Sequence, residues 1–158
     1  MNSDQIIMTK DGYEQVKNEL NHLKGVHRRE VAERIRESKQ FGEFLENSEY
    51  EEAKAEQAYV EGRILELQHI LQHAVVVDGP QETGDKIGIG SLVQVRDERT
   101  GKETEYRIVG PVEADPANHR ISYQSPVGQA LLDRSTGDVV KVQAPNGANL
   151  YRVLSVTN

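Results

Sequence analysis

The 158-residue chain has no cysteine and no tryptophan, and only 5% of its residues are aromatic. The absence of cysteine excludes disulfide bonds and zinc sites built from thiolates. With a hydrophobic fraction of 36%, the scarcity of aromatic side chains argues against one large core. An elongated element beside a small core fits this composition better, and the length allows one domain or two small ones.

The sequence also lacks segments that suggest export or membrane insertion. Residues 1–4 show no basic stretch followed by an apolar one, which a signal peptide requires. No apolar run approaches the roughly 20 residues of a membrane-spanning helix. Basic residues are outnumbered by acidic ones, 19 to 26, which gives a net charge of −7. We therefore expect a cytoplasmic protein without membrane contact, and one that does not bind nucleic acid by itself.

The motifs of common enzyme classes are missing. There is no P-loop, and the glycines between residues 84 and 90 precede a predicted strand, so they do not form a dinucleotide fingerprint. His69 and His73 are four residues apart, as two zinc ligands on one helix can be, but no third ligand accompanies them. Ser125 has no evident His–Asp partnership. These observations give no support to a catalytic site of the chain's own.

The first half of the chain predicts two long helices. Apolar residues alternate spacings of three and four, which is typical of a coiled-coil seam. On the first helix this seam comprises Tyr13, Val16, Leu20, Leu23 and, less regularly, Val26, Val31 and Ile35. On the second helix it comprises Tyr50, Ala53, Gln57, Val60, Ile64, Leu67, Leu71 and Ala74. Thr9 is a suitable N-cap for the first helix, and Asp11 suits the positive end of its dipole.

The two helices are interrupted at Phe41 and Gly42. Glycine adopts backbone angles that a helix does not use, so we expect an antiparallel coiled-coil hairpin whose tip lies at residues 42–48. A parallel dimer of one long helix is the alternative. Gly42 and the decay of the first seam near the bend count against that dimer.

Carboxylates crowd the predicted tip. Between residues 43 and 56 the only cation is Lys54, and six glutamates share the segment: Glu43, Glu46, Glu49, Glu51, Glu52 and Glu56. These carboxylates repel one another, which suggests a positive partner such as a metal ion or a basic channel. A solvated charged turn is the alternative. Glu43 and Glu46 are three apart, so they can converge on one face and offer oxygen ligands to magnesium. Because two carboxylates cannot hold magnesium tightly, we expect them to complete a site begun by another macromolecule, or to orient a water that the metal activates.

From residue 74 onward the pattern changes to short strands separated by turns. Residues 74–80 are expected to end the second helix and enter an extended segment, and strands are predicted at residues 92–95, 103–109, 120–123, 139–142 and 150–156. A turn at residues 99–102 and the Asn146-Gly147 pair indicate hairpins, and Ser125-Pro126 predicts the start of a short helix over 127–132. The chain is thus predicted to be α+β, with a helical hairpin over 1–78 and a small antiparallel sheet with one helix over 79–158.

The segment from Gly42 to Tyr50 closely resembles the tip motif of bacterial transcript cleavage factors of the GreA/GreB family. Other matching segments follow in the same order along the chain: residues 28–35, 53–64, 106–110, 113–116, 121–122, 125–128 and 137–138. The resemblance covers nearly the whole chain, from Met8 to Val156. It implies an N-terminal antiparallel coiled coil followed by an FKBP-like C-terminal domain.

The resemblance also implies a function in transcription elongation. Such factors dock on bacterial RNA polymerase with the C-terminal domain and insert the coiled coil into its secondary channel. There they stimulate the polymerase's own cleavage of backtracked RNA, which rescues arrested complexes. The chain is therefore expected to act as a monomer, not as an enzyme, and to have no cofactor beyond the magnesium held in the polymerase active centre.

Carried over by position, the two tip acids of the family correspond to Glu43 and Glu46, which would share the polymerase-held magnesium. Glu46 matches the family pattern, whereas Glu43 stands where Asp is usual and Phe44 stands where Leu is usual. The extra methylene of Glu43 can displace its carboxylate by about 1 Å, which is enough to affect catalysis. The resemblance assigns support of the tip to Gly42, Asn47 and Tyr50.

Two further groups of residues are assigned by the resemblance. Polymerase docking is expected at Gln124, Ser125 and Pro126, where an ordinary loop is the alternative. Contact with the extruded RNA or the channel wall is expected for Arg28, Arg29 and Arg36, because cations attract phosphates. Helix cations paired with neighbouring glutamates are the alternative for these arginines.

Two other functions compete with cleavage stimulation. Some relatives with altered tip acids block the channel, so an inhibitor of transcription is one alternative, and Glu43 keeps it open. A chaperone or prolyl isomerase is the other, because both use FKBP-like domains. The C-terminal half has no Phe and no Trp, so an aromatic pocket for proline is poorly supplied.

Overall fold

The computed structural model describes residues 4–41, 48–77, 86–145 and 147–158. These residues form two compact units. One is Glu14–His73, and the other combines the described residues up to Tyr13 with Ala74–Asn158. The predicted division between residues 78 and 79 falls outside the described residues and stays a prediction. No helix in the described ranges is long and apolar enough to cross a membrane.

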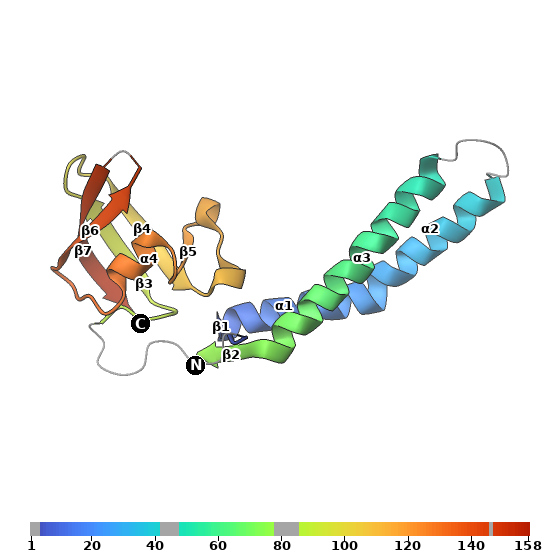
Figure 1. Ribbon diagram of the computed structural model, residues 1–158, viewed down its shortest axis with the longest axis horizontal. Helices are drawn as coiled ribbons and strands as arrows, with labels where there is room; N and C mark the ends of the chain where they lie inside the picture. The colour runs from blue at the N-terminus through green and yellow to red at the C-terminus, as the bar shows by residue number, and fades with distance from the viewer. Residues whose placement is uncertain (1–3, 42–47, 78–85, 146) are drawn as a thin grey trace. The chain divides into compact units, whose positions relative to one another are not determined.

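The unit Glu14–His73 is a helical hairpin with two arms (Figure 1). The arms are α1 (Lys10–His22), the π-helical η1 (Leu23–His27) and α2 (Arg28–Phe41) on one side, and α3 (Ser48–His73) on the other. Glu19 of the first arm pairs with Arg63 of the second, and Arg34, further along the first arm, pairs with Glu56, which comes earlier in the second. The two arms therefore run in opposite directions. The predicted antiparallel hairpin within one chain is therefore confirmed.

A narrow apolar seam lies between the arms. Its buried members are Val16, Leu20, Leu23, Val31 and Ile35 on the first arm and Ala53, Val60, Ile64, Leu67 and Ile70 on the second. The prediction was wrong for Val26, whose side chain is 37% exposed. In η1 the Arg28 amide bonds to the Leu23 carbonyl, five residues back, where an α-helix spans four. The wider turn places Val26 outside the seam and brings His27 to Glu56 of α3.

The second unit contains a five-stranded sheet in the order β5-β4-β3-β7-β6. The strands are β3 (Leu92–Asp97), β4 (Glu103–Val109), β5 (Arg120–Ser122), β6 (Val139–Ala144) and β7 (Gly147–Thr157). The predicted hairpins β3–β4 and β6–β7 are antiparallel, and β3 also pairs antiparallel with β7.

The edge pair β4–β5 is parallel, so the α+β class is confirmed but the sheet is mixed. A tight hairpin would force these strands to be antiparallel. Instead, the chain between them makes two 3₁₀ turns, η2 (Pro111–Glu113) and η3 (Pro116–Asn118). This longer connection returns the chain to the end of the sheet from which β4 started.

The core of the sheet unit lies between the sheet and α4 (Pro126–Leu131). It consists of Ile87, Val93, Val95, Ile108, Ile121, Leu131, Val140, Val142 and Val153. The predicted start of α4 is confirmed, because the Gly128 amide donates to the Ser125 hydroxyl at 3.1 Å and Pro126 occupies the first helical position. This cap fixes the segment that carries the predicted docking residues.

A short parallel pair, β1 (Ile6–Thr9) with β2 (Ala74–Val77), lies at the ends of the hairpin sequence. The extended segment predicted from residue 74 contains β2, whereas β1 was not predicted, because its strand character comes from pairing with β2 at the other end of the hairpin sequence. Thr9 caps α1 as predicted, since its hydroxyl accepts the Gly12 amide at 3.1 Å. The chain thus enters α1 from β1 and leaves α3 into β2, and both strands belong to the sheet-containing unit.

Candidate functional site

The predicted tip lies largely beyond the described part of the chain. The residues concerned are Gly42, Glu43, Glu46 and Asn47, and their roles stay predictions. Tyr50 lies in the first turn of α3 and is half-buried. Glu49 and Glu51 share this turn, where the helix dipole favours negative charge. Part of the acidity near the tip therefore has a local explanation.

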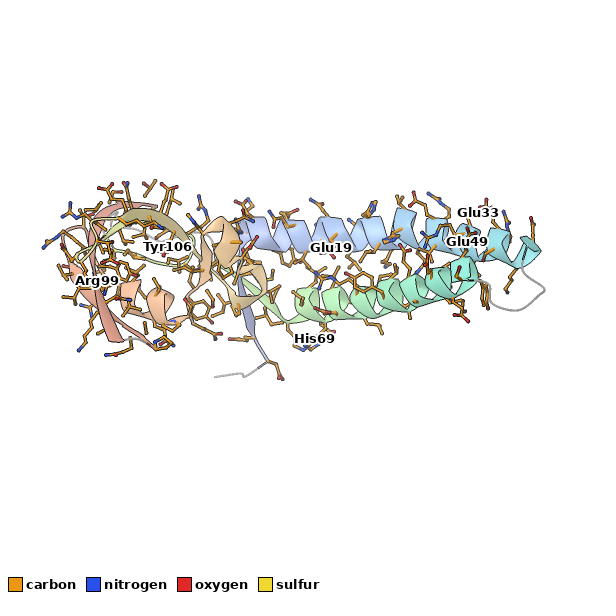
Figure 2. The ribbon with its side chains drawn as sticks, turned by 90° about the horizontal axis from the view of Figure 1, so that it is seen from above. Glu19, Glu33, Glu49, His69, Arg99 and Tyr106 are labelled. Atoms are coloured by element: carbon orange, nitrogen blue, oxygen red, sulfur yellow. The ribbon has the colours of Figure 1, made fainter. Side chains whose placement is uncertain are left out.

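A pocket of about 430 Å³ opens between α2 and α3 near the tip end of the hairpin. It is lined by Arg34, Glu37, Ser38, Glu49, Glu52, Ala53 and Glu56. Figure 2 shows Glu33 and Glu49 at this same end, on opposite arms. Four carboxylates surround one guanidinium in the pocket wall, so its net charge is negative. Such a surface attracts cationic partners.

Glu56 joins the two arms inside this region. Its carboxylate lies 2.7 Å from His27 Nε2 and accepts a hydrogen bond from Arg34. The His27 hydrogen bond, and next the Arg34 hydrogen bond, hold the pKa of Glu56 below its usual value. The π turn makes this pairing possible, because it brings His27 to α3. Glu56 is therefore an ionised bridge between the arms.

The three arginines predicted to meet RNA or the channel wall differ in their surroundings. Arg28 donates two hydrogen bonds to Glu61, at 2.9 and 2.8 Å, and the hydrogen bond with Glu61 raises the pKa of Arg28 further. Arg36 pairs with Glu33 one turn away on α2. Arg29 is exposed and has no ion pair or hydrogen bond within the described ranges. Arg29 is thus the cation of this group that is most available to an anionic partner.

A second pocket, which we call the sheet groove, lies in the sheet unit and has a volume of about 580 Å³. Its apolar wall combines strands and α4: Tyr106, Ile121, Val127, Val142 and Tyr151. Polar residues at its margin include Lys102, Glu103, His119 and Asn149. Burial raises the pKa of the Tyr106 hydroxyl, so this side chain stays uncharged over a wider range of pH than an exposed tyrosine.

The predicted docking residues lie at this groove. Ser125 and Pro126 line it, and the neighbouring Gln124 is exposed. The Ser125 hydroxyl donates to the Ser122 carbonyl at 2.7 Å while it caps α4. A methyl group on Gly128 would overlap the Ser122 carbonyl, so the turn and the helix are closely fitted. The segment therefore presents a fixed edge to the groove.

Sequence reasoning did not find the far wall of the groove. Tyr106 and Tyr151 come from β4 and β7, which are distant in sequence, and β3 lies between them in the sheet. The two tyrosines were a usable signal, because a half-buried tyrosine often marks a recognition surface. Their proximity to Pro126 depends on the strand order, which the sequence did not reveal.

The described residues hold no cluster of three or more histidine, aspartate or glutamate side chains suited to a metal ion. His69 and His73 do lie together, with ring centroids 4.2 Å apart, and His73 Nδ1 is 2.9 Å from the His69 carbonyl. The His73 ring therefore bonds to the backbone of its own helix.

Comparisons with known proteins cover almost the whole chain. The family model described as "Transcription elongation factor, N-terminal" matches residues 6–76, and "Transcription elongation factor, GreA/GreB, C-term" matches residues 81–158. The chain is 46% identical over 150 residues to "Transcription elongation factor GreA" of Clostridium kluyveri, covering 95% of this chain and 94% of the relative. The protein of the same name from Acetivibrio thermocellus is 46% identical over 152 residues, covering 96% of each.

A solved structure is also similar. It is titled "Crystal structure of GreA factor homolog 1 (Gfh1) protein of Thermus thermophilus" and is 31% identical. The match covers 98% of this chain and 99% of that chain, with a TM-score of 0.43.

Proposed function

Because the chain belongs to the GreA/GreB family of transcription elongation factors, we propose that it stimulates cleavage of backtracked RNA by bacterial RNA polymerase. The factor enters the secondary channel of the polymerase as a monomer in the cytoplasm. It contributes carboxylates and does not cleave RNA by itself. The observation that carries this proposal is the antiparallel hairpin, which has one acidic end.

The hairpin has the dimensions for this task. The 26 residues of α3 rise about 39 Å at 1.5 Å per residue. Charged pairs also link the two arms at two levels, Arg63 with Glu19 and Arg28 with Glu61. A thin, braced element of this length suits insertion into a channel.

The proposed role of the tip carboxylates depends on the magnesium ion that the polymerase holds. Glu43 and Glu46 would be the residues that offer oxygen ligands to a magnesium ion held by the polymerase, and that ion would supply activation of the attacking water. The acidic flank around Glu49 and Glu52 adds long-range attraction to a cationic site. Gly42, Asn47 and Tyr50 hold the turn that aims the two carboxylates.

The sheet groove anchors the factor on the polymerase outside the channel. Its apolar wall and the fixed edge at Ser125 and Pro126 suit a protein surface that offers an apolar side chain. Gln124 lies beside that edge and is exposed, so its amide can bond to the same partner. Buried apolar contact of this kind supplies affinity, while the tip supplies the chemistry.

Arg29 is proposed to contact the extruded RNA or the channel wall, since its guanidinium has no partner in the described chain. Arg28 and Arg36 reach the same surroundings only by sharing or leaving Glu61 and Glu33. Phosphate attraction favours such an exchange inside a complex.

The test is RNA cleavage in a halted, backtracked elongation complex. We compare the native chain with Glu46→Ala, Glu43→Asp and, as a matched control on the hairpin, Glu66→Ala. Cleavage should fall on the order of a hundredfold for Glu46→Ala with binding retained, while Glu66→Ala stays near the native rate. Unchanged cleavage after removal of both tip carboxylates would overturn the proposal.

Glu43 favours one other candidate, an inhibitor that occupies the channel without promoting cleavage. Its longer side chain stands where the family usually has Asp, so the pair of carboxylates can miss the productive geometry. An inhibitor slows nucleotide addition and leaves RNA length unchanged, whereas a stimulator shortens the RNA. If Glu43→Asp alone converts the chain from the first behaviour to the second, the native protein is the inhibitor.

A further inference from the structure

The root of the hairpin is held by one buried carboxylate. We define the root as β1, β2 and the first turn of α1, residues 6–13 and 74–77, all in the sheet-containing unit. Glu113 ends the 3₁₀ turn η2, and its side chain is only 2% exposed. A carboxylate that is removed from water in this way needs strong hydrogen-bond donors in exchange.

The hydrogen-bond donors to Glu113 come from the root and from the segment between Gly110 and Arg120, and we call this contact the joint. Glu113 Oε2 accepts the amides of Thr9 at 2.8 Å and of Gly110 at 3.2 Å. Glu113 Oε1 accepts the Thr9 hydroxyl and lies 3.7 Å from Arg120 Nη2. The same hydroxyl accepts the Gly12 amide, so the cap of α1 and the Glu113 contact share one oxygen.

Two glycines allow this close approach. A methyl group on Gly12 would overlap the Glu113 carboxylate, and a methyl group on Gly110 would overlap the Ile7 carbonyl. The root thus has a glycine where Glu113 comes nearest to it, and the segment that carries Glu113 has a glycine where the root comes nearest. Because the two amides, the hydroxyl and the guanidinium all surround one buried carboxylate, this is a fitted joint and not a chance contact of two surfaces.

We propose that Glu113 is a positioning residue that couples docking at the groove to delivery of the tip. The inference rests on the proposed function. Glu113 holds the segment from which α1 begins, and small errors there grow along the hairpin. A tilt of about 10° at the root moves the far end of a roughly 39 Å helix by about 7 Å, whereas catalysis is sensitive to about 1 Å.

The experiment uses two variants that disturb the joint differently. Glu113→Gln removes the charge that faces Arg120 and turns an NH₂ group toward a donor. Gly12→Ala keeps the carboxylate and inserts a methyl group into its place. The matched controls are Glu98→Gln, which removes another paired carboxylate of this unit, and Gly62→Ala, where the added methyl meets no atom within 4 Å.

We measure polymerase binding and the cleavage rate at saturating factor separately. Both joint variants should bind within about threefold of the native chain and lose on the order of 10- to 100-fold in maximal cleavage rate. Both controls should match the native protein. Thr9→Ser retains the hydroxyl and should keep nearly full cleavage, while Thr9→Val should resemble Glu113→Gln.

Hydrogen exchange of the Thr9 and Gly12 amides reports the joint itself. The proposal requires faster exchange at these amides in the joint variants while the amides of β3 and β7 stay protected. If Glu113→Gln unfolds the sheet, Gly12→Ala decides the outcome. Full cleavage despite an opened joint overturns the inference, and so does an equal loss of binding and cleavage. A native chain that stimulates no cleavage defeats the proposed function instead, and the exchange data then still show whether Glu113 holds the root.

Discussion

The helical hairpin and the sheet unit are stabilised in different ways. Each arm of the hairpin contributes one line of buried residues, and charged pairs such as Arg28–Glu61 and Arg63–Glu19 brace its flanks. The sheet unit instead gathers its buried apolar residues into one cluster under α4. The hairpin therefore spreads its stability along its length, while the sheet depends on a few central side chains.

This difference matches the proposed division of labour. A long hairpin with a narrow apolar seam exposes most of its residues, so their charges can complement the wall of a channel. A compact sheet keeps the sheet groove and the Ser125 turn in a fixed arrangement. Matched substitutions of one residue type in each region test this difference in stability.

The largest effect is expected from the sheet core. Ile108 is fully buried, so Ile108→Ala should lower the unfolding free energy of the sheet unit by about 2–5 kcal/mol. Leu65→Ala on the hairpin is the control, since Leu65 is 68% exposed and should change stability by less than about 0.5 kcal/mol. Urea unfolding with residue-resolved hydrogen exchange measures both. Equal loss of protection at Val60 and Val93 in the first variant would mean that the two regions unfold as one.

Glycine-to-alanine changes should act in opposite directions in the two regions. Gly62 lies inside α3 with open space around it, so Gly62→Ala should stabilise the hairpin by about 0.5–1 kcal/mol. Gly101 lies in the β3–β4 turn with φ of +75°, so Gly101→Ala should cost about 1–2 kcal/mol. Thermal unfolding followed by circular dichroism tests the pair. A shift of the same sign in both variants would contradict the comparison.

The smallest effect is expected from the charge bridge at Glu56. Hydrogen bonds from His27 and Arg34 lower the pKa of Glu56 in the folded state, so its ionised form contributes stability above its unfolded pKa of about 4.3. That contribution disappears as the pH falls through the lower folded pKa. Glu56→Gln should therefore be less stable than the native chain near neutral pH, and the difference should vanish once the pH falls below the folded pKa.

The control for Glu56→Gln is a carboxylate of another exposed ion pair. Glu98 pairs with Arg152 on the surface of the sheet unit, so Glu98→Gln isolates the effect of losing one exposed pair. Acid titration of the helical signal, with sheet amides followed by NMR, separates the two regions. A Glu56→Gln difference that persists unchanged at low pH would show that the side chain matters for packing and not for charge.

Much of the fold could be predicted because its signals are local. Alternating spacings of three and four revealed both helices, Thr9 and Ser125 marked two helix starts, and the turn at residues 99–102 marked the β3–β4 hairpin. Each of these features depends on residues within one or two turns of each other. The family resemblance extended this to Gln124, Ser125 and Pro126, of which Ser125 and Pro126 line the groove.

The remaining features were missed because they depend on distant partners. The strand character of β1 comes from pairing with β2, at the other end of the hairpin sequence. The parallel edge β5 depends on the path of the chain through η2 and η3. Val26 fits the heptad pattern, yet the π turn leaves it exposed and brings His27 to Glu56 instead.

Local patterns in the sequence are enough to predict two helices, the interruption between them and the gathering of acids near it, because spacing, capping and charge act between near neighbours. The folded chain is needed to learn that Tyr106 and Tyr151 share a groove with Pro126, and that Glu113 holds Thr9 across 104 positions of sequence. Such contacts form when strand order and close backbone approach bring remote residues together. No local pattern encodes them, since the buried carboxylate is favourable only where donors from separate segments meet.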